Sequence, residues 1–359
     1  METTTSSRVL SRRGLLRWLR NLVVGSFAIL VLLLLAGAAY QSIAQTADAH
    51  RFPQQGRSVP LGPSFPGLAL NINCTGQGSP VVVLDTGAGV PAVGWDLVQP
   101  EIAKFTRVCS YDRAGYGWSD PGPMPRTSIE IAKELHALLV AAGEKPPYIL
   151  VAHSLGGFNI RVYNHEYSSD VAGMVLVDAS DEDQRSLMTP AMLAFMDRQG
   201  RSMNLYHVMA PWLIRFGGSR VAMSLRPKAP PGMPETTFQE MRYLMLQPKY
   251  VDALVSEAAV MFPESAAEVR SAGNLGNKPL IVLTAGEIDQ PPVLPPGVTQ
   301  RDIDNMRDAH IRQAQMRAGA LSTRGRQILI SDSHHMIPFE RPDAIVTAVR
   351  EVYTAADRP

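Results

Sequence analysis

Short apolar runs that predict buried β-strands recur along the chain, and amphipathic stretches that predict helices separate them. Residues 67–73 alternate apolar and polar side chains, which indicates a half-exposed antiparallel strand. Residues 129–142 show helical spacing of their apolar positions. A continuous Val-rich run, typical of a buried strand, lies at residues 80–84, and further short, mainly apolar strands are predicted at residues 107–111, 148–151, 171–177, 280–284 and 327–330. Strands that alternate with helices predict an α/β fold with a mostly parallel sheet covered on both faces.

One long stretch, residues 181–277, breaks this alternation. It contains prolines, amphipathic segments and ten of the sixteen methionines of the chain. The pattern predicts a helical cap inserted between two strands of the sheet. Because thioethers fill irregular gaps, most of these methionines are expected in packed cores. A sharper hypothesis is that some of them line an apolar, adaptable substrate pocket.

The first 66 residues have a pattern of their own. A basic segment, residues 1–21, precedes the uncharged apolar run 22–40, and a polar linker follows at residues 41–66. As a helix, the apolar run would span roughly 28 Å, which is close to the thickness of a bilayer core. It therefore predicts a transmembrane anchor. The arginines in front of it predict that the N-terminus stays inside and that the rest of the chain lies on the periplasmic or extracellular side.

A cleaved export signal is the alternative interpretation of the same segment. Residues 36–38 and 42–44 could each serve a signal peptidase, and Arg12-Arg13 resembles a twin-arginine signal. Both interpretations place the body of the protein across a membrane. The net charge of +1 gives no electrostatic footprint for nucleic acid.

The candidate chemistry centres on residues 148–157, where an apolar strand runs directly into Ala-His-Ser-Leu-Gly-Gly. A strand that stops at a serine and restarts as a helix is the layout of a nucleophile elbow. The turn is tight, so the residues two before and two after Ser154 must be small. Ala152 and Gly156 meet that demand, although glycine is more usual at the first position.

This serine turn, together with Asp-Arg-Ala-Gly-Tyr-Gly-Trp-Ser at residues 112–119, resembles the α/β-hydrolase superfamily. Within it, the chain is similar to bacterial membrane-associated hydrolases with an N-terminal apolar segment. The resemblance implies an eight-stranded, mostly parallel sheet flanked by helices. The core would comprise residues 67–180 and 278–359, with the cap at 181–277. The sequence contains no Cys/His cluster with metal-ligand spacing, and no cofactor or metal is expected.

The resemblance also implies a catalytic triad in the order nucleophile, acid, histidine. Ser154 is the expected nucleophile and needs a base within hydrogen-bond reach. Of the adjacent His334 and His335, the spacing to Glu340 selects His335. The family pattern Gly-x-x-Asp after the strand at 280–284 selects Asp289 as the acid, and Glu287 and Asp178 are the alternatives.

Two further features follow from the resemblance. The oxyanion hole would use the backbone amides of Leu155 and Ala88. Cys74 and Cys109 lie on strands that are neighbours in this fold, so a disulfide is expected in an exported domain, with two buried free thiols as the alternative.

The expected function is hydrolysis of a small apolar carboxylic ester, or a related acyl compound, through an acyl-enzyme. The same triad also serves proline iminopeptidases, lactonases, carbon–carbon bond hydrolases and acyltransferases, and fold alone does not separate them. A ligand-binding receptor without turnover is the non-enzymatic alternative. Nucleic acid is not an expected partner, and the membrane is expected to be contacted through the N-terminal helix.

Overall fold

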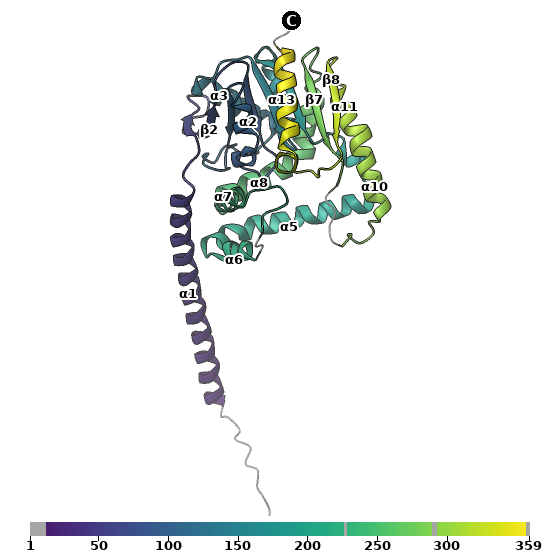
Figure 1. The fold of residues 1–359 in the computed structure, drawn as a ribbon. Helices are drawn as coiled ribbons and strands as arrows, with labels where there is room; N and C mark the ends of the chain where they lie inside the picture. Colours follow the sequence, from purple (N-terminus) through teal and green to yellow (C-terminus); the bar gives the residue numbers. More distant parts are fainter. Residues whose placement is uncertain (1–11, 226–227, 289–292, 357–359) are drawn as a thin grey trace, which may run out of the picture.

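The computed structural model describes residues 12–225, 228–288 and 293–356. Figure 1 shows a long N-terminal helix, a sheet flanked by helices, and a group of helices at one end of that sheet. The eight strands lie in the order β1-β2-β4-β3-β5-β6-β7-β8. They are β1 (Arg57–Pro60), β2 (Ala69–Thr75), β3 (Val81–Asp85), β4 (Val108–Tyr111), β5 (Tyr148–His153), β6 (Val171–Val177), β7 (Leu280–Ala285) and β8 (Gly325–Ile330).

The sheet confirms the predicted α/β architecture. Strand β2 pairs antiparallel with β1 and β4, and every other pair of neighbouring strands is parallel. The alternation within β3 explains the two covered faces: Val81 and Val83 belong to one core cluster, and Val82 and Leu84 belong to the other. All four side chains are buried, as expected for a strand between two helical layers.

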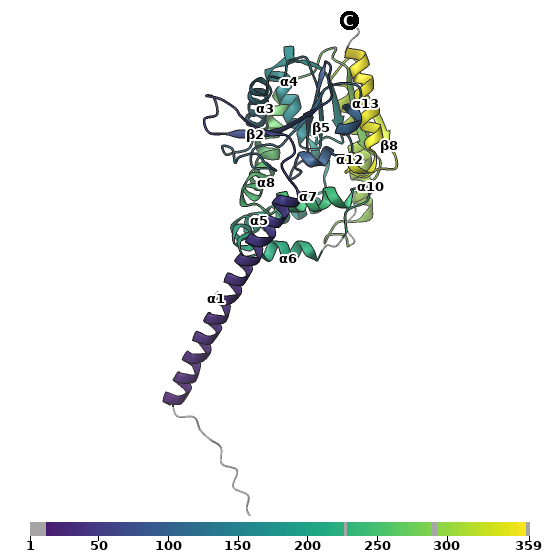
Figure 2. The same cartoon turned by 60° about the vertical axis from the view of Figure 1, so that its left-hand side comes forward.

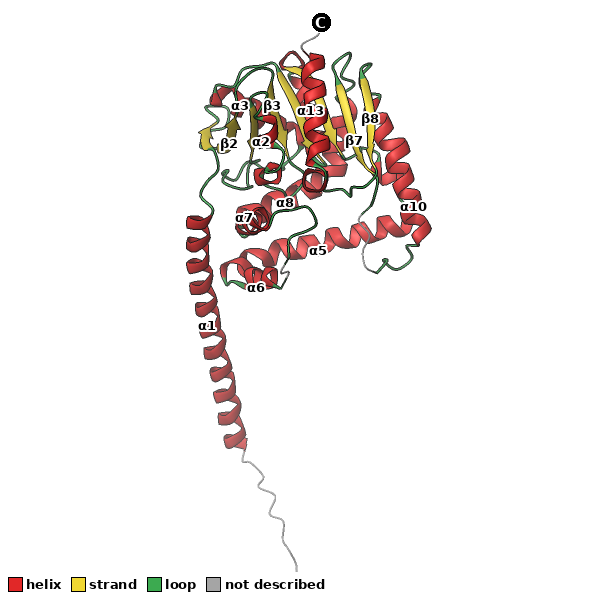
Figure 3. Ribbon diagram, viewed as in Figure 1, coloured by secondary structure: helices red, strands yellow, loops and turns green. Residues whose placement is uncertain are grey.

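Helices from distant parts of the chain form these two layers. The first core cluster includes residues of α3 (Ser128–Ala142) and α4 (Gly156–Glu166). The second cluster includes residues of α2 (Gln99–Ile102), α12 (Ile337–Glu340) and α13 (Pro342–Ala356). Figure 3 shows the yellow strands between these red helices. Between β7 and β8 lie α10 (Gln300–Ala309), a π-helical turn (His310–Ala314) and α11 (Gln315–Gly319).

Between β6 and β7 the described residues form a group of helices, which we call the helical insert (residues 181–277). Its members are α5 (Pro190–Arg215), α6 (Gly218–Ser224), α7 (Glu235–Met245), α8 (Pro248–Val260) and α9 (Ala266–Ser271). Figures 1 and 2 show α5 to α8 at one end of the sheet, with α8 between α5 and the strands. The strands β3, β5, β6 and β7 end toward this side, so the loops that follow them face the insert.

The N-terminal helix α1 (Arg12–Arg51) is longer than the apolar run that predicted it. Its segment Gly14–Arg51 contains an 18-residue window with a mean hydropathy of 2.7. The segment is long and apolar enough to cross a membrane, and a signal sequence would meet the same criterion. The predicted linker at 41–66 differs from the structure at both ends. The helix continues to Arg51, and β1 lies within the predicted linker because it pairs with β2.

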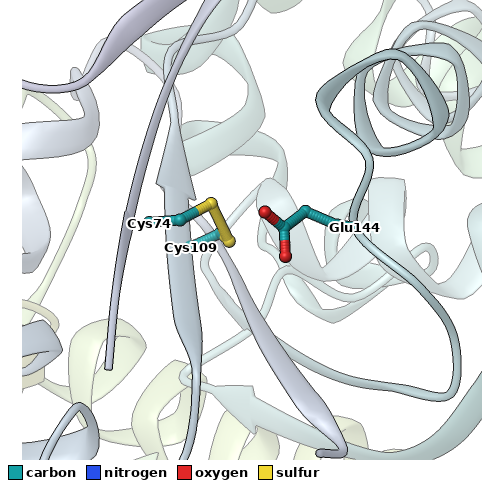
Figure 4. A group of neighbouring side chains, drawn as sticks. All are labelled: Cys74, Cys109 and Glu144. Atoms are coloured by element: carbon teal, nitrogen blue, oxygen red, sulfur yellow. A yellow bond between two sulfur atoms is a disulfide. The ribbon is translucent and has the colours of Figure 1, made fainter. Parts of the chain in front are cut away.

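Cys74 and Cys109 form a disulfide that joins β2 to β4 (Figure 4). The two residues are direct partners across this antiparallel pair, so their side chains point to the same side of the sheet. The bond encloses a sequence separation of 35 residues, for which the chain-entropy model gives about 4 kcal/mol of stabilisation. The disulfide thus fixes the edge of the sheet on which β1 and β2 sit.

Candidate active site

Ser154 lies at the turn between β5 and α4, as the strand-to-helix pattern predicts. Its φ of 54° is in the left-handed region, which side chains other than glycine rarely adopt. The turn is closed tightly, because a Cβ on Gly156 would lie 2.7 Å from the Thr86 carbonyl oxygen and 3.2 Å from the Ala152 Cβ. The small residues on both sides of Ser154 are therefore required by packing.

His335 lies on the loop between β8 and α12 and connects Ser154 to an acid. Its Nε2 is 3.0 Å from the Ser154 Oγ, and its Nδ1 is 2.6 Å from the Asp178 Oδ2. An ionised carboxylate can only accept hydrogen bonds, so Nδ1 carries the proton and Nε2 can accept the serine hydroxyl. Ser154, His335 and Asp178 thus form one hydrogen-bonded chain.

Asp178 follows β6 and is held by three donors. Its Oδ1 accepts the backbone amide of Ala285 at 2.9 Å and the His310 Nε2 at 2.8 Å, while its Oδ2 faces His335. Burial raises the pKa of this carboxyl, but hydrogen bonds from His310 and His335 outweigh it, and the net pKa lies well below the usual range. Its φ of 41° makes Asp178, with Ser154, one of the two described non-glycine residues with positive φ. Such strain collects at functional sites.

The other two predicted acids have different positions. Glu287 is half-exposed and lies 3.9 Å from the Arg307 guanidinium. Asp289 lies outside the described residues. Among the three candidate acids, Asp178 is the one that the described part of the chain brings to His335.

The neighbouring histidines have supporting contacts. The His153 Nε2 donates to the backbone carbonyl of His335 at 2.8 Å. Burial, aided by the nearby His335, lowers the pKa of His153 to about 3, so this ring is neutral. His334 is exposed, and its backbone amide donates to Glu340 at 2.7 Å. His153 and Glu340 therefore hold the loop that presents His335.

The loop after β3, residues 86–89, faces the serine turn. A Cβ on Gly87 would lie 3.1 Å from the Ser154 Cβ, so only glycine allows this approach. Gly89 is tied down at both polar groups: its amide donates to the Tyr116 hydroxyl at 3.2 Å, and its carbonyl accepts from the Tyr250 hydroxyl at 3.0 Å. Ala88, the predicted oxyanion donor, lies between these two fixed glycines and is exposed.

A buried ion-pair network holds this loop from below. The Arg113 guanidinium donates to the Asp85 carboxylate at 2.7 Å and to the carbonyls of Thr86 and Gly87 at 2.7 and 2.9 Å. It also makes a two-pronged pair with Glu257 on α8, at 2.8 and 3.0 Å. All three charged side chains are at most 1% exposed. Arg113 thus joins the β3 loop to the helical insert.

Two cavities border this region. One, of about 260 Å³, is lined by residues that include Asp178, His310, His335 and Met306. The other, of about 720 Å³, lies between α5, α6 and α8, and its walls include Met203, Met223 and Leu254. Leu254 also reaches the β3 loop, since its Cδ1 would lie 3.2 Å from a Cβ on Gly89. Two methionines of the insert therefore line a cavity, and its use as a substrate pocket stays a prediction.

Within the described residues, the one cluster of potential metal ligands is Cys74, Cys109 and Glu144 (Figure 4). Its two sulfurs are joined in the disulfide. The Glu144 carboxylate accepts two hydrogen bonds from Arg107, each of 2.7 Å. The donor set therefore fits a structural role better than metal binding.

Sequence reasoning missed His310 and Glu257. His310 begins a π-helical turn, and such turns are frequent at functional sites, but nothing in the local sequence announces one. Glu257 lies 144 residues from Arg113. The signal for this partner was indirect: the arginine at residue 113 stands in an otherwise apolar and glycine-rich segment and would need a buried acid.

Comparisons with known proteins agree with the observed fold. Similar solved structures include a thermophilic esterase from Thermogutta terrifontis, with 21% identity, a TM-score of 0.55, and coverage of 84% of this chain and 99% of the esterase. An enol-lactonase from Burkholderia xenovorans LB400 has 16% identity and a TM-score of 0.55, with 81% and 99% covered. At these identities, the likeness concerns the fold.

One curated relative is the protein named "Probable transporter efuK" from Hormonema carpetanum. It is 38% identical over 109 residues, which are 29% of this chain and 16% of that protein. The matched part spans less than half of the length of each curated relative. The model of the alpha/beta hydrolase family matches residues 81–348, which is well over half of the chain. The chain belongs to the alpha/beta hydrolase family.

Proposed function

We propose that this hydrolase cleaves a carboxylic ester, or a closely related acyl compound, through an acyl-enzyme on Ser154. The observation that carries the proposal is the chain of short contacts from Ser154 to His335 and from His335 to Asp178. A serine hydroxyl becomes a competent nucleophile when a neighbouring base removes its proton. The neutral His335 Nε2 faces that hydroxyl at 3.0 Å.

In the proposed acylation, the Ser154 Oγ attacks the ester carbonyl carbon as its proton passes to the His335 Nε2. The resulting imidazolium is stabilised by the ionised Asp178, in the role that Asp289 was first expected to fill. The oxyanion of the tetrahedral intermediate accepts hydrogen bonds from the backbone amides of Leu155 and Ala88. His335 then gives its proton to the departing alcohol, and the acyl-enzyme remains.

Deacylation reverses these roles. Water loses a proton to the His335 Nε2 and attacks the acyl carbon, and the second intermediate releases the carboxylic acid while Ser154 regains its proton. The rigid β3 loop supports this scheme, because an oxyanion hole must be in place before charge develops. Arg113, Tyr116 and Tyr250 supply that rigidity through the contacts described above.

Replacement of Ser154 by Ala tests the proposal. Turnover of a p-nitrophenyl ester should fall by several orders of magnitude, because the nucleophile is lost. Ser180→Ala, in the loop after β6, is a control that should retain turnover. Labelling by a serine-directed fluorophosphonate should occur in the wild type and in Ser180→Ala but not in Ser154→Ala. A wild-type chain that neither reacts with the label nor hydrolyses a panel of esters, lactones and proline amides would favour the receptor alternative.

We also propose that α1 remains attached as a membrane anchor, with the hydrolase on the periplasmic or extracellular side. The support is that α1 packs against the helical insert around both candidate cleavage sites: a Cβ on Gly37 would lie 2.4 Å from the Phe216 carbonyl oxygen, and Gln41 and Asp48 flank the second site. The Arg220 guanidinium donates to Gln41 at 3.0 Å and to Asp48 at 2.5 Å. Residues 36–38 and 42–44 are moreover helical in the structure, whereas a peptidase needs an accessible backbone. Intact-mass measurement of the membrane fraction should show residues 1–44 retained; their loss would favour the cleaved signal.

A further inference from the structure

The helical insert carries a stripe of large apolar side chains that no described element covers. Leu205, Val208, Met209 and Trp212 on α5 are 63%, 69%, 48% and 64% exposed. Their spacing places them on one helix face. Val221 on α6 and Leu225, which directly follows α6, are 53% and 78% exposed. We call these six residues the apolar ridge. A soluble surface seldom leaves so many large apolar side chains together without a partner.

The opposite face of α5 is packed in the usual way. Ala210 and Ile214 are buried in one cluster with Tyr250 and Val251 of α8. Figures 1 and 2 show α8 between α5 and the sheet, so the apolar ridge is on the side of α5 that points away from the sheet. That is the direction in which the N-terminal half of α1 extends.

The contacts of α1 with the junction of α5 and α6 set the level of the apolar ridge relative to the bilayer. A Cβ on Gly37 of α1 would lie 2.4 Å from the Phe216 carbonyl oxygen, at the junction of α5 and α6. A Cβ on Gly217 would lie 3.2 Å from the Tyr40 ring. Tyr40 ends the uncharged apolar run of the predicted anchor. The junction of α5 and α6 is therefore at the level where α1 leaves the apolar phase.

We propose that the apolar ridge docks into the surface of the same bilayer that α1 spans. Three observations combine: the exposed apolar stripe, its orientation along α1, and the depth set by Gly37 and Tyr40. Arg201 and Arg215 are exposed on α5 as well, where their charges can meet lipid phosphate groups. A second copy anchored in the same bilayer would approach from the side, and so would not cover a face that points toward the lipid.

The cavity between α5, α6 and α8 connects this docking to a class of substrate. This step rests on the proposed esterase function. The cavity borders Met203 and Leu213 of α5 and Met223 of α6, and its wall residue Leu254 lies next to Gly89 of the β3 loop, two residues from the Gly87 that faces Ser154. The lining is largely apolar, as an alkyl chain requires. The substrate class is then a membrane-dissolved ester with a long alkyl chain, which passes from the bilayer between α5 and α6.

A matched pair of cysteine variants tests docking without any activity measurement. Both native cysteines are in the disulfide, so an introduced thiol is the one that reacts with an NBD label. Val208→Cys places the label on the ridge. Val140→Cys is the control, because Val140 is 64% exposed on α3. Helix α3 ends just before β5 begins, so Val140 lies near the end of the sheet that is away from the insert.

The full chain is reconstituted in phosphatidylcholine–phosphatidylglycerol vesicles, with iodide equilibrated on both sides. The label at position 208 should be quenched by nitroxide-bearing lipid and shielded about tenfold from iodide relative to the label at position 140. Equal iodide quenching at both positions would overturn the proposal. Shielding at position 208 without quenching by the lipid nitroxide would also overturn it and would indicate that a second copy covers the ridge.

A second measurement addresses the substrate class. Val208→Glu should lower the ratio of turnover of a vesicle-embedded long-chain ester to that of a dissolved short-chain ester by about tenfold, because a charge disfavours contact with lipid. An unchanged ratio, with the wild type active on both esters, would overturn entry from the bilayer. Loss of both activities in the wild type would instead count against the esterase function and would leave the labelling result to decide docking.

Discussion

The carboxyl end of the sheet and the helical insert differ in whether their energetically costly groups have partners. The costly groups are buried charges at the sheet and exposed apolar side chains on the insert. At the sheet edge, Asp85, Arg113 and Asp178 are buried charges, and each has partners at hydrogen-bond distance. In the insert, the apolar ridge is left open instead. Chemistry requires groups that are fixed before the substrate arrives, whereas contact with lipid requires an apolar surface that is open to it.

The largest expected effect concerns Asp178 at the sheet edge. Asp178→Asn should reduce kcat by about 10⁴-fold, because an amide in that place no longer fixes the His335 tautomer or stabilises its charge. The measurement is ester turnover with circular dichroism as a check of folding. Asp289→Asn and Glu287→Gln are the matched controls and should stay near the wild type. Equal loss in Asp289→Asn would return the acid to the position that the family pattern selected.

The next effect concerns the contact between the two regions. Arg113→Met should lower the free energy of unfolding by about 3–5 kcal/mol, because it leaves the buried Asp85 and Glu257 without their counter-charge. Chemical denaturation of the full chain in detergent micelles measures it. The control is Arg341→Met, which removes exposed pairs with Asp332 and Asp343 and should leave the free energy of unfolding close to that of the wild type. A loss in Arg113→Met as small as in the control would mean that the buried network does not hold the insert.

A smaller effect is expected at His310, which donates to the same carboxylate as Ala285. His310→Ala should lower kcat about tenfold with little change in KM, since Asp178 loses one of its three donors and shifts relative to His335. His310→Gln retains an N–H donor and should recover much of the rate. Equal defects in both variants, or a defect confined to KM, would argue for a merely structural histidine.

The smallest expected effect is a pH dependence of the stability of the fold. It concerns Glu240, which lies where the insert contacts the segment between α1 and β1. Glu240 on α7 accepts hydrogen bonds from Gln55 at 3.0 and 3.1 Å, and burial raises its pKa from 4.5 to about 7. Its protonated form is therefore favoured by folding. The stability that it contributes is complete below pH 4.5 and is lost as the pH rises through 7.

Glu240→Gln copies the protonated side chain and should raise Tm at pH 8 by about 3 °C, with no gain near pH 4. Thermal melts of the full chain across this range check it. Glu235→Gln, at an exposed position of α7, provides a control for the removal of a negative charge from the same helix. A gain that does not depend on pH would assign the effect to packing rather than to titration.

The sequence predicted the parts of the molecule whose cause is local. The continuous apolar runs at 80–84 and 148–151 predicted two central strands, and the small residues around Ser154 predicted the turn. The cysteine pair was expected from the resemblance, and the structure places Cys74 opposite Cys109. For the strands and the turn, the determining interactions are within a few residues or within a pattern that one strand carries by itself, whereas the expected cysteine pair depended on the family resemblance.

The acid at the site was not determined in this way. Asp178, Glu287 and Asp289 all follow strands that end at the same edge, so each could come near the histidine loop. Asp178 meets His335 because β6 ends between β5 and β7, and because its positive φ turns the side chain toward the histidine. His310 joins them from 132 residues away, through a π-helical turn that has no local signature.

By itself the sequence determined the fold class, the serine turn and the presence of one long apolar helix, because periodicity, residue size and spacing act locally or are repeated along the chain. Only the tertiary structure decided which carboxylate faces His335, which buried charges join the sheet to the insert, and where the apolar ridge lies relative to α1. Those outcomes depend on distances between residues that are far apart in the chain, and such distances are fixed only when the strands and helices pack.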